Sequence, residues 1–362
     1  MAQAIWARSP KLWCKLSTLA PSARPGMVLK TRLTEMLGIQ HPIIQGGMQY
    51  VGYAEMASAV SNAGGLGVLT GLTQPSPEDL RAEIRRCREM TSKPFGVNLT
   101  ILPALIPADY DGYVDVVAEE RVALLEVAGA SPKKYMKQLH AAGVKVLHKS
   151  ATLRHALKAQ EAGVDLIEIV GYEASIAGGQ PGDEVGLWVV LPRAVPLLSV
   201  PVIASGASAT GRQLAAALSM GAQGITMATR FLCTVEAPIH HRIKEHMARP
   251  DVDERSTTVV LRSLNNATRV FRNDVSLTMN RLDEEMQGNV DFSKIAPYAS
   301  GVRTKKMWQE TGDWNDSMWS CSQSVGLISD IPTCKDLLTG IVAEAEAQLT
   351  LSAACVAAPS RL

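Results

Sequence analysis

The chain has 362 residues, 46% of them apolar, which suits one large barrel with an addition, or two ordinary domains, around a sizeable core. Its 36 Lys and Arg almost balance its 35 Asp and Glu, and a net charge of +1 gives no electrostatic case for nucleic acid or an acidic membrane as partner. No apolar run reaches the roughly 18 residues of a membrane span, and the six scattered cysteines lack the spacing of a disulfide framework or a metal site, which fits a reducing compartment.

The first 34 residues contain no Asp or Glu and carry six Lys or Arg. This composition is typical of a mitochondrial presequence, but it equally suits an upstream stretch before a start at Met27. At the other end, Ser360, Arg361 and Leu362 resemble a variant of the S-K-L peroxisomal address. The two addresses conflict, so peroxisome and mitochondrion both stay open, and we expect a cytoplasmic location if neither address is used.

Eight short apolar runs alternate with helical stretches from His41 onward. Among the helical stretches, Pro132–Ala142 and Leu153–Ala162 end at glycines, as helix C-terminal caps do. Eight strands with crossover helices predict a parallel (β/α)₈ TIM barrel, with an open doubly wound sheet as the alternative. The expected strands are His41–Gln45, Gly67–Leu69, Phe95–Leu99, Val122–Val127, Val144–Leu147, Leu166–Val170, Pro201–Ala204 and Gly224–Met227.

The alternation stops after the eighth strand. Residues 235–317 are charged and helical in pattern, without further strand alternation, and predict a small helical lid. The barrel would then comprise residues 35–234 with 318–350, its last helix lying within 334–349. Residues 1–34 form an N-terminal extension and residues 351–362 a flexible tail.

Two turns of small residues follow the last two expected strands. One is the end of Pro201–Gly206 (PVIASG), and the other lies within Gly224–Phe231 (GITMATRF). A (β/α)₈ barrel holds a cofactor phosphate at this place, because backbone N–H groups must approach the anion closely. Other small and polar residues at expected strand ends are Gln45, Gly46, Gly47 and Met48, then Asn98, Glu126 to Gly129, Lys149, and Gly171 to Glu173.

Seven motifs in this order resemble the nitronate monooxygenase family, formerly called 2-nitropropane dioxygenases, and its relatives. Those relatives are the FMN-dependent NADH:quinone reductases and the FMN-type enoyl-ACP reductases. The resemblance covers about Leu33 to Leu349. It is carried by QGGM, SNAGGLGVLTG, PFGVN, HKS around Lys149, PVIASG, TRF and QSVGLI.

The resemblance implies bound FMN and assigns roles to single residues. Met48 and Asn98 would contact the flavin ring, and Lys149 would place its charge near the pyrimidine end, where negative charge develops on reduction. Further cofactor contacts would come from Gln45, Gly46, Ser205, Gly206, Ala207, Ser208, Ala228, Thr229, Arg230 and Gln323. Structural roles remain as alternatives: a solvated Lys149, a loop-capping Asn98, an Arg230 paired with the lid, and a Gln323 on a helix surface.

The sequence departs from the family pattern at Gln180 and at four glycine positions, which here are Ala207 and Ala228 at the phosphate site and Ser317 and Ser322 near Gln323. Gln180 stands in AGGQPG where the family usually has a histidine, and glutamine cannot take a proton. Ala207 and Ala228 replace glycines, which is tolerated only where φ is negative. Of the remaining histidines, His148 is expected to face the helices, opposite Lys149, and His240 is a candidate on the substrate side.

We therefore expect an FMN-dependent oxidoreductase that converts alkyl nitronates and dioxygen into a carbonyl compound and nitrite. Gln180 and Lys149 would be its catalytic residues, and its partner a small molecule. A nitronate, already an anion, needs no protein base, so neutral nitroalkanes should react poorly. The alternatives are an NADH:quinone or enoyl-thioester reductase on the same barrel, and a flavin-binding barrel without catalysis.

Overall fold

The computed structural model describes residues 29–102, 108–175, 184–264, 266–286 and 291–356. Four sequence-based expectations concern residues outside these ranges. They are residues 1–28 of the expected N-terminal extension, the role of Gln180, the C-terminal address Ser360 to Leu362, and most of the expected flexible tail.

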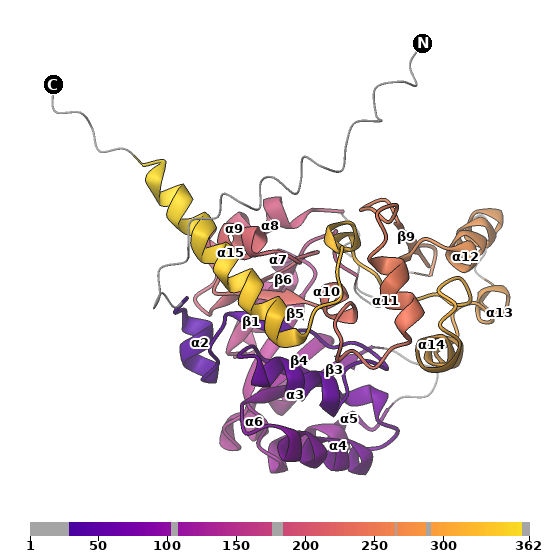
Figure 1. Cartoon of the computed structure of the whole chain (residues 1–362). Helices are drawn as coiled ribbons and strands as arrows, with labels where there is room; N and C mark the ends of the chain where they lie inside the picture. Colours follow the sequence, from indigo (N-terminus) through magenta and orange to yellow (C-terminus); the bar gives the residue numbers. More distant parts are fainter. Residues whose placement is uncertain (1–28, 103–107, 176–183, 265, 287–290, 357–362) are drawn as a thin grey trace.

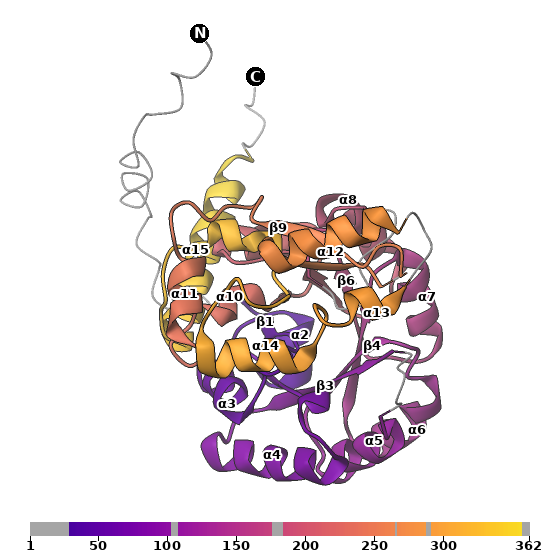
Figure 2. The same ribbon diagram turned by 90° about the vertical axis from the view of Figure 1, so that its right-hand side faces the viewer.

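Eight parallel strands form the predicted barrel, and each strand pairs with its neighbours in chain order (Figures 1 and 2). β8 also pairs with β1, and a parallel bridge between Ile44 and Leu66 joins β1 to β2. The (β/α)₈ TIM barrel expected from the sequence is thus confirmed. The strands are β1 (Ile43–Gln45), β2 (Gly67–Thr70), β3 (Phe95–Ile101), β4 (Leu124–Gly129), β5 (Lys145–Ser150), β6 (Leu166–Val170), β7 (Val202–Ser205) and β8 (Ile225–Met227).

The Gln45 side chain completes the β1–β2 seam, where main-chain pairing is sparse. The Gln45 backbone N–H donates to the Leu66 carbonyl at 2.9 Å. Its side-chain Oε1 accepts from the Val68 N–H at 3.0 Å, and Nε2 donates to the Val68 carbonyl at 3.2 Å. The amide therefore takes the place of the next peptide unit in the ladder.

The helices that surround the barrel have local sequence signals at both ends. Ser76, Thr152, Thr210 and Thr333 each cap a helix N-terminus with a side-chain oxygen, and Gly143 and Gly163 follow helices with φ of +79° and +91°. The surrounding helices are α3 (Ala54–Asn62), α4 (Pro77–Met90), α5 (Tyr110–Glu119), α6 (Met136–Ala141), α7 (Leu153–Glu161), α8 (Leu187–Ala194) and α9 (Gly211–Ser219).

The last helix, α15 (Cys334–Ala354), packs against α9 and α3 and closes the outer ring, as expected. Its Glu344 accepts a hydrogen bond from the backbone N–H of Gly211 at 2.7 Å. The helix continues through residues 351–354, which the sequence analysis assigned to a flexible tail, so that boundary was wrong. No helix in the described ranges is long and apolar enough to cross a membrane.

The region between α10 (Thr229–Leu232) and α15 covers one end of the barrel (Figure 2). It contains α11 (His241–Met247), α12 (Asp274–Glu285), α13 (Phe292–Ile295) and α14 (Gly301–Lys306). It also contains an antiparallel hairpin of β9 (Thr257–Val260) and β10 (Thr268–Phe271). The expectation that no strands follow β8 was therefore wrong, because two four-residue strands among charged residues give little alternation to detect.

Candidate active site

The barrel interior changes from apolar to polar between one inward-facing position of the strands and the next. Near the closed end, Leu124, Leu147, Leu166 and Ile203 pack with Leu33 and Leu37 of α2 (Arg32–Leu37). Residues two positions further along a strand point to the same side. The next inward-facing positions are therefore Glu126, Lys149, Glu168 and Ser205, which form a polar layer below the barrel mouth.

Lys149 lies inside this layer, with 15% of its side chain exposed. Its Nζ is 2.6 Å from Glu126 Oε1 and 3.3 Å from Glu168 Oε1. Burial lowers the pKa of Lys149, but the charges of Glu126 and Glu168 raise it by more, so the net shift is upward. Lys149 is therefore a fixed cation of the barrel mouth, and the alternative of a solvated strand-end lysine is not what the structure has.

Glu126 connects Lys149 to the loop after β1. Its Oε2 accepts from the Gly47 N–H at 3.1 Å and from Asn98 Nδ2 at 3.2 Å. Gly47 has to be glycine, because a Cβ there would lie 2.4 Å from Asn98 Cγ. Asn98 is thus held by Glu126 beside the β1 loop, rather than capping a loop of its own.

Glu168 faces a different set of partners. Its Oε2 is 2.9 Å from Thr226 Oγ1 on β8, and the Ser205 hydroxyl on β7 also bonds to it. Its exposure is 0%. Burial raises the pKa of Glu168, and the negative charge of Glu126 raises it further, against the lowering effect of Lys149.

The loops after β7 and β8 present unused backbone donors. Within the described ranges, no acceptor is bonded to the N–H groups of Gly206, Ala207 and Ser208, or to those of Thr229 and Arg230. Ala207 has a φ of +58°, so the chain bends sharply in the left-handed region between these donors. Successive N–H groups in such a bend form an anion-binding concavity. The arrangement can therefore hold a phosphate, at the place where the sequence analysis expected one.

The two alanines of this site differ in backbone conformation. Ala228 has a φ of −130°, which meets the condition of a negative φ. Ala207, with its positive φ, does not meet the condition under which the sequence analysis considered alanine tolerable there. Gly206 lies against the start of α8, since a Cβ would come within 3.0 Å of Leu187 Cβ.

Hydroxyl groups line the β8 side of this concavity. Thr229 Oγ1 accepts from the Ser322 N–H and the Ser322 hydroxyl, each at 3.0 Å, and Ser322 Oγ lies 2.7 Å from Ser324 Oγ. Gln323 lies between these serines on the 3₁₀ turn Gln323–Leu327, with its N–H bonded to the Glu173 carbonyl at 3.1 Å. The chain after the lid thus returns to the site, as the QSVGLI motif suggested.

Arg230 points away from the barrel mouth. Its guanidinium pairs with the Asp330 carboxylate and donates to the carbonyls of Asp330 and Cys233, both at 3.3 Å. Only its backbone N–H belongs to the concavity. The Arg230 side chain is thus in an ion pair, as in the alternative reading, but its partner Asp330 lies after the expected lid, residues 235–317.

The remaining expected residues also have defined partners. Met48 is buried, and its N–H donates to Thr70 Oγ1 at 2.8 Å. Gly46 lies above Lys149, whose Nζ would be 3.6 Å from a Cβ at that position. His148 is buried with Nδ1 2.9 Å from Ser150 Oγ, and burial lowers its pKa to about 4. His240 caps α11, with Nδ1 accepting from the Arg242 N–H at 3.3 Å.

Sequence reasoning assigned no role to Glu126 or Glu168, although both stand in the middle of otherwise apolar strands. A carboxylate in a buried parallel strand needs a partner or a proton. A Glu inside an apolar run was therefore the sequence signal that could have identified both residues. Arg269 on β10 was not assigned a role from the sequence either. It is 5% exposed, donates two hydrogen bonds to the Tyr172 carbonyl, and its guanidinium lies 4.7 Å from the centre of the Tyr172 ring.

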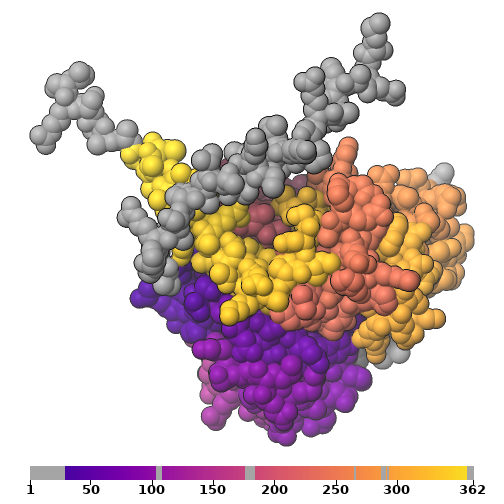
Figure 3. Space-filling model, viewed as in Figure 1, coloured from indigo at the N-terminus to yellow at the C-terminus, as the bar shows by residue number. Residues whose placement is uncertain are grey.

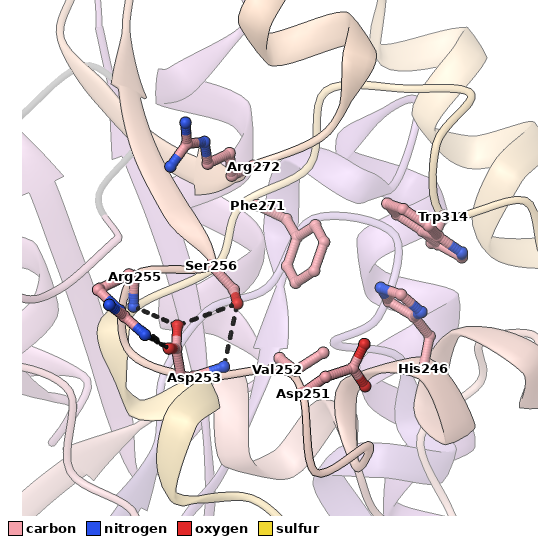
Figure 4. Close-up of a pocket in the computed structure, with 9 residues that line it drawn as sticks. All are labelled: His246, Asp251, Val252, Asp253, Arg255, Ser256, Phe271, Arg272 and Trp314. Carbon is pink, nitrogen blue, oxygen red and sulfur yellow. Dashed lines mark hydrogen bonds and ion pairs between the residues drawn. The ribbon is translucent and has the colours of Figure 1, made fainter. Parts of the chain in front are cut away.

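A separate cavity of about 390 Å³ lies in the lid (Figure 4). Phe271 and Trp314 form its aromatic wall, and His246 stacks on Trp314 with ring centres 3.8 Å apart. Its charges balance, since Asp251 and Asp253 offset Arg255 and Arg272. None of the residues expected from the sequence lines it.

Comparison with known proteins identifies the family. The family model described as nitronate monooxygenase matches residues 30–106 and 103–344. A (3aS,4S,5R,7aS)-5-hydroxy-7a-methyl-1-oxo-octahydro-1H-indene-4-carboxyl-CoA dehydrogenase from Rhodococcus jostii is 33% identical, over 88% of this chain and 96% of its own. The nitronate monooxygenase of Pseudomonas aeruginosa is 30% identical, over 64% of this chain and 77% of its own.

Among solved structures, FabK from Thermotoga maritima superposes with a TM-score of 0.81 at 32% identity, covering 90% of this chain and 99% of its own. The family match extends through the strands that carry Asn98, Lys149 and Gly206 and onward to the returning segment at Gln323. The chain is therefore an oxidoreductase that belongs to the nitronate monooxygenase family.

Proposed function

We propose that this protein binds FMN and exchanges a hydride with an acyl thioester. The observation that carries the cofactor assignment is the pairing of two features at one barrel mouth. Unused backbone N–H groups at Gly206 to Ser208 suit a phosphate, and the buried Lys149 suits a ring that gains negative charge. FMN has these two ends.

The residues present fit this group. Gly46 and Gly47 add no side chains of their own beside Lys149, and the Thr226 and Asn98 side chains pack directly against them, within 3.0 Å of where a Cβ would lie. The Thr229 hydroxyl accepts from Ser322, so its own proton is available as a donor beside the N–H groups after β7 and β8. FMN, when bound, supplies the hydride-transfer chemistry.

The chain's own residues would orient the reaction and stabilise its charge. The Lys149 ammonium offsets negative charge that develops at the mouth, and its contacts to Glu126 and Glu168 keep its position fixed. Asn98 is held by Glu126 beside the β1 loop, where its amide can orient a planar group. The lid covers the same end of the barrel and would limit access of water.

The thioester assignment is supported by how much of each relative is matched. The R. jostii CoA dehydrogenase is matched over 96% of its length and FabK over 99%, lid included. The match to the P. aeruginosa nitronate monooxygenase covers 77% of that protein. Oxidation of alkyl nitronates remains the second candidate, favoured by the family match, and it requires no base at Gln180.

Anaerobic reduction of the purified yellow protein tests the proposal. A saturated acyl-CoA, NADH and an alkyl nitronate are each mixed with the enzyme, and loss of flavin absorbance is followed. Bleaching by the acyl-CoA, or bleaching by NADH that an enoyl-CoA reverses, is the expected result. Bleaching by the nitronate alone would favour the second candidate, and a flavin that stays oxidised with all three donors would contradict both.

Lys149→Met should slow this reduction by about 100-fold, because one preorganised charge at a reacting group contributes that order of rate. Lys145→Met is the matched control on the same strand. Lys145 is 41% exposed and pairs with Asp165 outside the mouth, so its replacement should leave the rate unchanged. Equal rates for both variants would remove Lys149 from the proposed mechanism.

A further inference from the structure

The polar layer contains more acid than base. Glu126 and Glu168 are both 0% exposed, and both contact the single ammonium of Lys149. Among the described residues, no other cation lies within ion-pair distance of either carboxyl group. Two ionised carboxylates would therefore leave one uncompensated negative charge in the barrel, and burying an unpaired charge is strongly unfavourable.

The hydrogen-bond partners distinguish the two glutamates. Besides Lys149, Glu126 meets only groups that donate, the Gly47 N–H and the Asn98 amide NH₂, and its contact to Nζ is the shorter one at 2.6 Å. A protonated carboxyl at this position would face donors on every side. Glu126 is therefore the carboxylate that pairs with Lys149.

Glu168 meets hydroxyls instead of N–H groups, at Thr226 and Ser205. A hydroxyl can accept a hydrogen bond as well as donate one. The 2.9 Å contact between Thr226 Oγ1 and Glu168 Oε2 is compatible with donation in either direction, so a carboxylic acid O–H at Oε2 would find an acceptor in the Thr226 hydroxyl. The longer contact of 3.3 Å to Lys149 Nζ is also compatible with a neutral acid.

We propose that Glu168 carries a proton in the resting protein and acts as a positioning residue, so that Lys149, Glu126 and Glu168 together have no net charge. In this state the positive charge of Lys149 is balanced by one negative charge, that of Glu126, rather than by two. Loss of the proton would put a negative charge next to the ammonium and oppose any anion bound above it. The proposal concerns groups of the chain itself, and it holds whichever substrate is correct.

The groups that face Glu168 define its pH response. Strand β5 contributes Lys149 and β4 contributes Glu126, whereas β7 and β8 contribute only the Ser205 and Thr226 hydroxyls. The pKa of Glu168 is raised, first by burial and then by Glu126. The folded protein therefore keeps this proton at pH values where the unfolded chain loses it. Its contribution to stability is complete below the unfolded pKa of about 4.3 and decreases as pH rises toward the folded pKa.

Infrared spectroscopy of the wild-type protein tests the proposal directly. With glutamate labelled by ¹³C, a protonated carboxyl C=O band that shifts in D₂O should be present at neutral pH. The band should be lost in Glu168→Gln and retained in Glu346→Gln. Glu346 is the matched control, because burial raises its pKa too, but it lies on α15. A wild-type spectrum without such a band at neutral pH would overturn the proposal even if no variant folds.

Stability as a function of pH gives a second readout. Between pH 4.3 and the folded pKa of Glu168, the folding equilibrium constant of wild type should decrease by up to tenfold per pH unit. The cause is that the folded protein keeps this proton while the unfolded chain loses it. Glu168→Gln mimics the neutral acid and should lack this pH-dependent decrease. The stability of the variant relative to wild type should therefore increase as pH rises. A constant stability difference at all pH values would mean that Glu168 is ionised, contrary to the proposal.

Discussion

At the scale of single residues, Ala207 has a backbone conformation that side chains disfavour. Its φ of +58° places it in the left-handed region, where an L-residue with a Cβ is less stable than glycine by about 1–2 kcal/mol. This bend lies between the unused N–H groups of the same loop. The strain is thus located in the loop that we assign to the phosphate.

Ala207→Gly should stabilise the protein by about 0.5–1 kcal/mol, the relief of that strain less the extra chain entropy of glycine. Urea unfolding measures the effect. The control is Ala228→Gly in the neighbouring loop, whose negative φ of −130° gives no left-handed strain to relieve, so glycine should not stabilise it. Destabilisation of similar size in both variants would show that Ala207 is not strained.

Single residues also decided how much of the site could be predicted. Lys149, Asn98 and the small residues after β7 stand at strand ends, where function in a barrel is expected, and the structure brings them to one mouth. Glu126 and Glu168 are the register partners of Asn98 and Lys149, but they stand inside LLEVAG and LIEIV, where the apolar pattern predicts burial and not the partner. Their pairing with Lys149 depends on the stagger of three strands, which no local pattern encodes.

At the scale of elements, the β9–β10 hairpin is anchored to the segment that follows β6. Arg269 donates to the Tyr172 carbonyl at 3.0 and 3.2 Å, and Ser175 donates to the Arg269 carbonyl. Arg262 donates to Glu184 at 2.6 Å and to the Tyr172 hydroxyl at 2.8 Å. The hairpin therefore bonds to Tyr172 and Ser175, which precede residues 176–183, and to Glu184, which follows them.

Arg269→Met should loosen this hairpin and leave the barrel intact. The substitution removes both hydrogen bonds that the Arg269 guanidinium donates to the Tyr172 carbonyl, and a hydrogen bond with a charged donor contributes about 1.5–3 kcal/mol. Hydrogen exchange should become faster in residues 257–271 and remain unchanged in β3 to β6. In the control variant Arg255→Met, the lost partner is Asp253, two residues away, and Arg255 is 82% exposed. Fast exchange in this control as well would contradict the anchoring role of Arg269.

The hairpin was the element that the sequence did not reveal. TTVV and TRVF have only four residues each, and Val260 and Val270 pack with Val275 and Met279 of α12. In strands this short, the alternation of polar and apolar residues is weak. The barrel strands were predicted because each is an apolar run between helices with recognisable caps.

At the scale of the whole molecule, the β1–β2 seam determines whether the barrel is closed. Gln45 was expected to bind the cofactor, but both polar atoms of its amide bond to Val68 within the barrel wall. We expect Gln45→Met to destabilise the protein by about 2–5 kcal/mol, because it leaves the N–H and the carbonyl of Val68 unpaired. Chemical denaturation measures this difference.

Gln138→Met provides the comparison, since the Gln138 amide bonds to Asp115 on the surface and should contribute little. If both variants unfolded at the same denaturant concentration, Gln45 would not be needed for closure, and its amide would be available to a ligand.

The order of the elements has a consequence for synthesis of the chain. The lid separates β8 from α15, so a ribosome completes all eight strands and the whole lid before the helix that covers α9 and α3 emerges. Until then, the face of α9 at Gly211, against which Ile341 and Ala345 of α15 pack, has no partner from α15. A nascent chain arrested inside the lid should consequently be a substrate for chaperones, whereas arrest well beyond residue 354 should release a folded enzyme.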